Sequence, residues 1–141
     1  MKKTKEFNWP VRVYYEDTDS GGVVYYANYL KFMERARTEL LRHLGFEQDQ
    51  LQQERGILFA VHSASVKYKK PARFNDELTV VTSIPALGKA SITFQQNVVK
   101  DDVVLVQGQI KIACLNAEKF APQTIPAGIL DSLQQEFDCG S

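Results

Sequence analysis

The sequence has few cysteines, no excess of charge of either sign and no long apolar run. Its two cysteines, Cys114 and Cys139, are spaced neither as metal ligands nor as a disulfide framework, so we expect free thiols in a reducing compartment. Its 17 basic and 17 acidic residues balance. This balance argues against a partner such as nucleic acid, because nucleic-acid binding needs a dense excess of lysine and arginine. These absences favour a cytoplasmic protein.

The chain also lacks the run of about 18 apolar residues that a membrane-spanning helix needs. Its basic N-terminus resembles the start of a signal peptide, but Glu6, Pro10, Arg12 and Glu16 interrupt every apolar stretch that follows. We therefore expect neither a transmembrane segment nor a secretion signal. With 141 residues, no internal repeat and no flexible linker, the chain is predicted to form one domain over residues 1–141.

Hydrophobic periodicity predicts one long helix set among strands. Residues 9–16 alternate in polarity, which predicts a half-buried strand with Trp9, Val11, Val13 and Tyr15 on one face. Residues 27–44 change to helical periodicity with a wide apolar stripe, and Gly45 follows as a C-cap. The other expected elements are a short helix at 47–55 ended by Gly56, strands at 57–70, 78–84, 90–99 and 103–115, and a short C-terminal helix at about 127–137.

The order of these elements restricts the fold class. Because the long helix is apolar over more than one face, it needs a large cover. The turns at 87–89 and 100–102 are short enough to join consecutive antiparallel strands. We therefore predict an α+β fold in which a five-stranded, curved antiparallel sheet wraps around one long central helix.

The densest group of chemically useful residues is the loop between the first strand and the long helix. It contains Glu16, Asp17 and Asp19, followed by the pair Gly21 and Gly22. Acidic residues just before a helix are commonly caps, and paired glycines commonly form a turn. The same place also suits catalysis, because the first backbone N–H groups of a helix can hold a developing oxyanion. Spacing alone leaves both interpretations open.

The loop and its flanks resemble the active-site signature of a known family. The segment VRVYYEDTDSGGVVYYANY at 11–29 resembles that of the hotdog proteins of the 4-hydroxybenzoyl-CoA thioesterase type. The likeness continues through ERARTELLR at 34–42 and KPARFND at 70–76. Within that family the chain looks most like the bacterial acyl-CoA thioesterases associated with the Tol-Pal envelope system. The implied fold is the hotdog fold that the element order independently favours.

The resemblance implies a hydrolase that converts acyl-CoA to free acid and CoA. It assigns to Asp19 the role of nucleophile or general base. It assigns to the backbone N–H of Tyr26 the role of hydrogen-bond donor to the oxyanion. Many relatives have histidine where this chain has Tyr26, so an acid–base histidine is not expected here. Asn28 either orients the thioester or caps the helix, and Gly22 and Val24 are expected to line the substrate.

Other polar residues of the chain have simpler explanations. Glu34 and Glu39 lie among Arg35, Arg37 and Arg42 at spacings that favour intrahelical salt bridges over catalysis. The two histidines, at 43 and 62, are not spaced as metal ligands, so we expect no metal. We expect His43 to meet the C-terminal dipole of the helix and His62 to lie at a subunit interface or in the core. No cofactor is expected, since CoA is part of the substrate.

A basic segment follows the second strand. Lys67, Lys69, Lys70 and Arg73 occur within seven residues that contain no acid. Such a run is commonly a solvated strand end; the alternative is that it receives the phosphates of CoA or the acidic surface of acyl carrier protein. Lys89 and Ser91, which open a later strand, are further candidates for substrate binding.

An exposed edge strand favours pairing with another copy, and the resemblance implies a homodimer with a continuous sheet, or a homotetramer, with Asp19 facing the partner. It also leaves open peripheral association with the inner membrane.

The competing function is a non-enzymatic hotdog protein that binds acyl carrier protein or envelope components. A dehydratase is disfavoured because neither histidine lies in the loop. The resemblance favours short-chain acyl groups. The candidates for setting acyl length are Met33, Leu58, Phe59, Tyr68 and Phe74.

Overall fold

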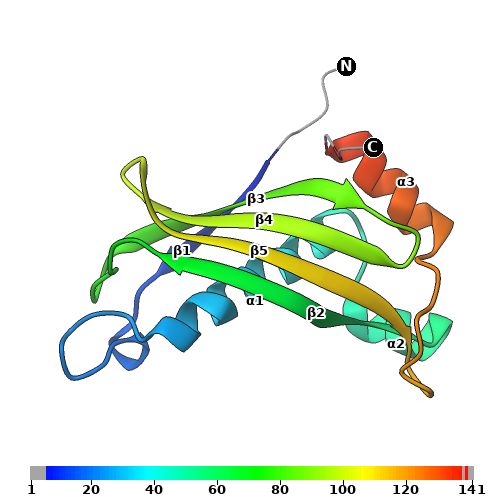
Figure 1. Cartoon of the computed structure of the whole chain (residues 1–141), viewed down its shortest axis with the longest axis horizontal. Helices are drawn as coiled ribbons and strands as arrows, with labels where there is room; N and C mark the ends of the chain where they lie inside the picture. The colour runs from blue at the N-terminus through cyan, green and yellow to red at the C-terminus, as the bar shows by residue number, and fades with distance from the viewer. Residues whose placement is uncertain (1–5, 138, 140–141) are drawn as a thin grey trace.

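The computed structural model describes residues 6–137 and residue 139 of the chain. Its elements follow the predicted order along the chain (Figure 1). They are β1 (Phe7–Arg12), a 3-10 turn η1 (Tyr15–Asp17), α1 (Tyr26–His43), α2 (Gln48–Arg55), β2 (Ile57–Tyr68), β3 (Glu77–Leu87), β4 (Ser91–Lys100), β5 (Val103–Asn116) and α3 (Ala127–Glu136). The 18-residue α1 agrees with the predicted helix to within one residue at each end.

The strands form one antiparallel sheet in the order β1-β3-β4-β5-β2. The hairpins β3–β4 and β4–β5 use the two predicted turns, and Asp101 and Asp102 turn the second with φ of 49° and 65°. Strand β2 precedes β3 in the chain but pairs with β5, so β1 and β2 are the two edges of the sheet. The long edge strand β2 is therefore free for pairing along one side.

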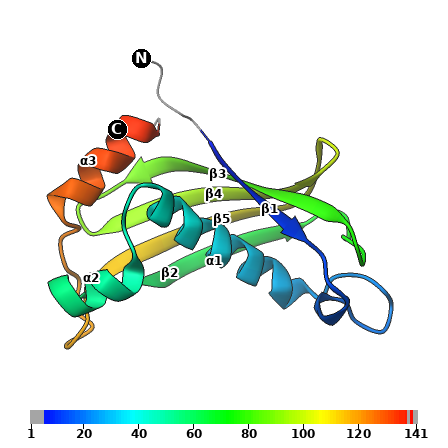
Figure 2. The same cartoon turned by 180° about the vertical axis from the view of Figure 1, so that it is seen from behind.

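Helix α1 lies along one face of the curved sheet (Figures 1 and 2). Its buried residues recur at helical spacing, and the inward residues of the strands alternate with outward ones, as burial on a single face requires. The helix comes close to Gly108 of β5, where an added Cβ would lie 2.9 Å from both Sδ and Cε of Met33. The predicted hotdog architecture, a five-stranded antiparallel sheet around α1, is confirmed.

The first strand is shorter than predicted. It ends at Arg12, and Tyr15, expected on its buried face, is 80% exposed. The reason is the side chain of Asp17: its Oδ2 accepts from the N–H of Tyr14 at 2.8 Å, while its own N–H donates to the carbonyl of Tyr14 at 3.0 Å. These two bonds close a turn where the alternation in the sequence predicted a continuing strand.

The helix ends agree with prediction. Gly45, one residue past the C-cap Leu44 of α1, has φ of 94°, and Gly56, the C-cap of α2, has φ of 65°. Both lie in the left-handed region, where glycine lacks the steric penalty of other residues. Among the helices that the structure describes, none is long and apolar enough to cross a membrane.

A polar group is buried between α1 and the middle of the sheet. Gln96 of β4 donates through Nε2 to the carbonyl of Met33 at 2.9 Å and to Oγ1 of Thr82 at 3.1 Å. Its Oε1 accepts from Nη1 of Arg37 at 2.9 Å. Gln96 is fully buried and Arg37 is 9% exposed, so this last bond supplies a partner to the buried Oε1 of Gln96 and to the buried Arg37 guanidinium.

We expect Gln96→Leu to lower the free energy of unfolding by about 3 kcal/mol, because it leaves the buried Arg37 guanidinium without that acceptor. Chemical denaturation measures the change. The double variant Gln96→Leu/Arg37→Leu should recover part of the loss. A Gln96→Leu protein as stable as wild type would show that the network contributes nothing.

Candidate active site

The loop before α1 is a tight turn held by its own backbone. The N–H of Asp19 donates to the carbonyl of Val23 at 2.9 Å, and the N–H of Gly22 donates to the carbonyl of Asp19 at 3.0 Å. Gly22 has φ of 79°, in the left-handed region that glycine tolerates. Val24 is buried, and its N–H donates to the carbonyl of Ala72 at 2.8 Å, which ties the loop to the segment after β2.

The side chain of Asp19 is exposed but oriented. Its Oδ1 accepts from the N–H of Gly21 at 2.8 Å, the geometry of an Asx-type turn. An added Cβ at Gly21 would lie 3.2 Å from this oxygen, so a larger residue would crowd the carboxylate. No hydrogen bond to Oδ2 comes from any residue that the structure describes. One oxygen of Asp19 is thus fixed and the other is free to act.

The N-terminus of α1 lies beside this loop. The N–H of Tyr25 donates to the carbonyl of Asp17 at 3.1 Å, whereas the N–H of Tyr26 has no acceptor among the described residues. Nδ2 of Asn28 donates to the same Asp17 carbonyl at 2.8 Å. Asn28 therefore joins the helix to the loop, and its role toward the thioester stays a prediction.

A pocket of about 290 Å³ contains Asp19 and the start of α1. Its wall is dominated by four tyrosines, Tyr25, Tyr26, Tyr29 and Tyr68. The ring of Tyr68 lies 5.3 Å from that of Tyr26 and 5.8 Å from that of Tyr29, measured between centroids. Burial raises the pKa of Tyr29 and of Tyr68, so both hydroxyls stay protonated at neutral pH.

The predicted substrate-binding residues divide into three places. Lys69 and Lys70 line the Asp19 pocket, and Arg73 forms a backbone bridge with Val23 of the loop. Lys67 lies on the outer face of the sheet, because it alternates along β2 with Tyr68, which faces α1. Lys89 and Ser91 lie at the β3–β4 turn, at the opposite end of the sheet from the loop (Figure 1).

The alternative acidic and histidine candidates lie elsewhere. Glu39 forms an ion pair with Arg42, as predicted, whereas Glu34 forms no ion pair with any described residue. His43 ends α1 with its ring 5.7 Å from that of Phe7, and His62 lies exposed at a bulge in β2 rather than in the core. Within the described residues, no three His, Cys, Asp or Glu side chains come together as a metal site would require.

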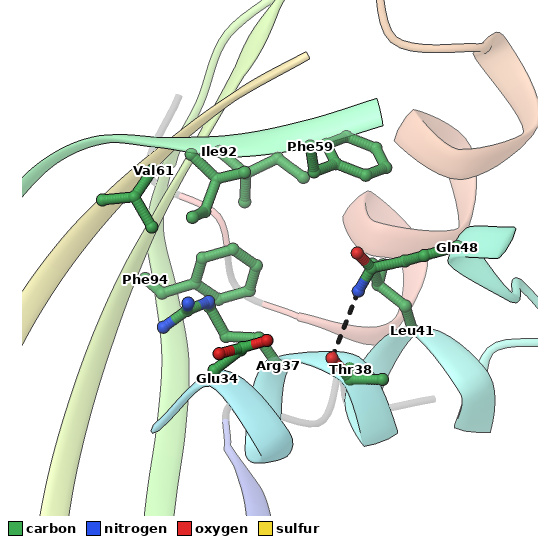
Figure 3. Close-up of a pocket in the computed structure, with 10 residues that line it drawn as sticks. Glu34, Arg37, Thr38, Leu41, Gln48, Phe59, Val61, Ile92 and Phe94 are labelled. Atoms are coloured by element: carbon green, nitrogen blue, oxygen red, sulfur yellow. Dashed lines mark hydrogen bonds between the residues drawn. The ribbon is translucent and has the colours of Figure 1, made fainter. Parts of the chain in front are cut away.

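A second pocket of about 280 Å³ lies further along α1 (Figure 3). Apolar side chains of the sheet, among them Phe59 and Phe94, face Glu34, Arg37 and Thr38 of the helix across it. Nε2 of Gln48 donates to Oγ1 of Thr38 at 3.3 Å at one end. None of the predicted catalytic residues lies in this pocket.

Sequence reasoning missed most of the tyrosine wall. Only Tyr68 was among the residues considered for acyl length, and Tyr26 was considered for its backbone alone. The signal available was the spacing of Tyr25, Tyr26 and Tyr29 in the first turn of the helix, which places their rings around its N-terminus. The contribution of Tyr68 depends on how β2 packs against α1, which the sequence does not state.

Comparison with known proteins identifies similar chains. Residues 21–107 match the family model described as the thioesterase superfamily. The acyl-CoA thioester hydrolase YbgC of Escherichia coli O157:H7 is 43% identical over 133 residues, which cover 94% of this chain and 98% of that protein. The acyl-CoA thioesterase YbgC of Haemophilus influenzae is 43% identical over 120 residues, 85% of this chain and 88% of that one.

Solved structures of similar sequence share the fold of this chain. A probable thioesterase from Bartonella henselae is 35% identical with a TM-score of 0.82, covering 86% of this chain and 99% of that one. A gentisyl-coenzyme A thioesterase is 31% identical with a TM-score of 0.82, covering 90% of this chain and 99% of that one.

The segment that carries Lys69 and Lys70 is anchored by Tyr29, whose Oη accepts from the buried N–H of Ala72 at 2.9 Å. We expect Tyr29→Phe to lower the free energy of unfolding by about 1–3 kcal/mol, because that N–H loses its acceptor. Thermal denaturation measures the change, with the exposed Tyr14→Phe as the matched control. Equal stability of the two variants would contradict an anchoring role.

Proposed function

Because the chain belongs to the thioesterase superfamily, we propose that the Asp19 pocket is where it hydrolyses the thioester of an acyl-CoA to free acid and CoA. The observation that carries the assignment is the juxtaposition of two unsatisfied groups in one pocket. These are the free Oδ2 of Asp19 and the N–H of Tyr26, which has no acceptor among the described residues. Oδ2 of Asp19 supplies electrons to the carbonyl carbon of the thioester. The N–H of Tyr26 stabilises the negative charge that develops on the carbonyl oxygen.

The N–H of Tyr26 suits the developing oxyanion. It is at the first position of α1, where backbone N–H groups lack intrahelical acceptors and the helix dipole favours negative charge. A donor placed before the reaction costs no reorganisation as charge develops, and losing one such donor typically slows turnover about 10²–10³-fold. The carbonyl oxygen of the thioester therefore points at the helix N-terminus, with its carbon toward Asp19.

Asp19 can act by either of two routes. Oδ2 attacks the carbonyl carbon and expels the CoA thiolate, leaving a mixed anhydride that water then hydrolyses. Alternatively, Oδ2 takes a proton from a water molecule that attacks the same carbon. Single-turnover reaction in H₂¹⁸O tests the first route: ¹⁸O in the Asp19 carboxylate shows that water opened a mixed anhydride at the aspartyl carbon.

Lys69 and Lys70 supply positive charge at the same pocket, and Arg73 adds to it next to the loop. We assign these three cations to the phosphates of CoA, because a cleft lined by positive charge attracts anionic groups. The same charge suits the acidic surface of acyl carrier protein, and that partner stays a prediction. Lys67, on the other face of the sheet, takes no part within one chain.

The size of the pocket favours a short acyl group. At about 290 Å³ it lies at the small end of the roughly 300–1,000 Å³ range of small-molecule sites. Its aromatic wall suits an apolar chain. A cytoplasmic location, the Tol-Pal association, peripheral contact with the inner membrane, the absence of a cofactor and a homotetramer rest on the sequence alone and stay predictions.

We expect Asp19→Asn to reduce kcat for acyl-CoA hydrolysis by at least about 10³-fold, because the amide neither attacks the carbonyl nor accepts a proton. The fold should survive, since an amide oxygen still accepts from the N–H of Gly21. Thiol release from butyryl-CoA measures the activity. Glu16→Gln, three residues away in an exposed position, is the matched control and should keep wild-type activity. Hydrolysis by Asp19→Asn at the wild-type rate would exclude this mechanism.

We propose that two copies pair through the edge strand β2. The strand is 12 residues long, has no neighbour on one side within the chain, and carries Val61 at 56% exposure. Long exposed edge strands are rare in proteins that stay monomeric, because their free N–H and C=O groups pair with other strands.

Accordingly, Val61→Glu should shift the mass in solution from that of the wild-type oligomer toward 16.0 kDa, because it places a charge on the edge strand through which the copies pair. Analytical ultracentrifugation measures the mass. Val103→Glu, at an exposed valine of β5, is the control and should leave the mass unchanged. A wild-type protein already of 16.0 kDa would contradict pairing through this edge.

A further inference from the structure

The Asp19 pocket is followed by two more hollows along the groove between α1 and the edge strand β2. The nearer one, of about 170 Å³, is lined by Leu30 and Lys31 of α1, Ala64 of β2 and Ile110 of β5, together with Glu34, Arg37 and Val61. The last three residues also line the pocket of about 280 Å³ in Figure 3, so these two hollows adjoin. These hollows therefore lie further along α1 than the Asp19 pocket.

A barrier of aromatic rings separates the Asp19 pocket from this continuation. Tyr26 and Leu30 are one turn apart on α1, and Tyr68 and Ala64 lie four residues apart on the same face of β2. Tyr26 and Tyr68 line the Asp19 pocket, whereas Leu30 and Ala64 line the next hollow. The contact between the Tyr68 and Tyr26 rings, with centroids 5.3 Å apart, stands at the boundary.

We propose that Tyr68 is a specificity-determining residue whose ring closes the inner end of the acyl pocket and so limits the length of the acyl chain. The inference rests on the proposed function of the Asp19 pocket and adds the position of its end wall. The groove past Ala64 is then the path that a longer chain would follow if the ring were absent.

The chemistry of the pocket sets the direction of the substrate. Lys69 and Lys70 follow Tyr68 in the chain and bring positive charge to the pocket. A CoA thioester has its phosphates at one end and its apolar chain at the other, so the phosphates lie against these lysines and the chain points away from them. The rings of Tyr26, Tyr29 and Tyr68 line the same pocket.

The ring of Tyr29 cannot be removed without losing a buried contact, because Tyr29 is 2% exposed and its hydroxyl accepts from the N–H of Ala72. Tyr68 is the last residue of β2 and is 47% exposed, and its pairing with Val106 of β5 is through the backbone. Truncating it therefore leaves the sheet and the core intact.

The test compares kcat/KM for acetyl-, butyryl-, hexanoyl-, octanoyl- and decanoyl-CoA between the wild type and Tyr68→Ala. We expect the wild type to lose activity sharply beyond a short chain. Tyr68→Ala should raise kcat/KM for octanoyl-CoA by about tenfold or more, the lower range for admitting or excluding a methylene in an apolar pocket. The exposed Tyr14→Ala is the matched control and should keep the wild-type profile.

Two more variants make the result specific. Tyr68→Phe keeps the ring and should keep the chain-length limit; a shift equal to that of Tyr68→Ala would assign the effect to the hydroxyl and overturn the proposal. Adding Ala64→Phe to Tyr68→Ala refills the next hollow and should cancel the gain for octanoyl-CoA. A gain that survives it would show that the chain does not follow this groove.

The outcomes separate this proposal from the one on which it rests. A wild type that hydrolyses short acyl-CoAs while Tyr68→Ala keeps the same chain-length profile overturns the role of Tyr68 alone. A wild type inactive on all five substrates overturns the proposed function, and the role of Tyr68 with it.

Discussion

The close approach of α1 to the centre of the sheet is the constraint on which the rest of the structure depends. It is possible because residue 108 has no Cβ, so that the side chain of Met33 lies directly on β5. The hydrogen bond from Gln96 to the carbonyl of Met33 then holds this part of the helix against the sheet. With its middle held in this way, the helix places its N-terminus over the end of β2, and Tyr29 joins that end to the helix through Ala72. The catalytic pocket is thus a consequence of core packing as much as of its own loop.

Charges of both signs line the Asp19 pocket within one chain. The chain has no net charge, yet Asp19, Lys69 and Lys70 line the same pocket. The segment that brings the lysines there is pinned at Asp76, which accepts from the N–H of Arg73 and from Nζ of Lys100. Burial raises the pKa of Asp76, but these bonds and the charges of Lys100 and Arg73 outweigh it, so the pKa lies below its usual value. Asp76 therefore stays charged and keeps the segment in place at neutral pH.

Periodicity was sufficient to predict the elements, because α1 and the inner strands each bury one face and so repeat with clear periods. It was wrong at Tyr15, because the N–H of Tyr14 donates to the Asp17 side chain and ends the strand, an interaction that alternation of polarity does not register. The resemblance indicated Asp19 and Tyr26, whose roles stay predictions. Proximity in the sequence did not predict which lysines line the Asp19 pocket, because neighbouring residues of a strand face opposite sides of the sheet. Lys67 and Tyr68 are adjacent in β2, but only Tyr68 lines the pocket, and Lys67 lies on the other face.

Tyr26 shows why one position can carry two functions without conflict. Its proposed catalytic group is the backbone N–H, whose position is set by the helix and not by the side chain. The side chain is therefore free to vary, and here its ring is 5.5 Å from that of Tyr25 and 5.3 Å from that of Tyr68. The chemistry and the shape of the pocket are thus specified by different atoms of the same residue. It follows that acyl selectivity can change through the rings around the helix N-terminus while the proposed oxyanion donor stays where it is.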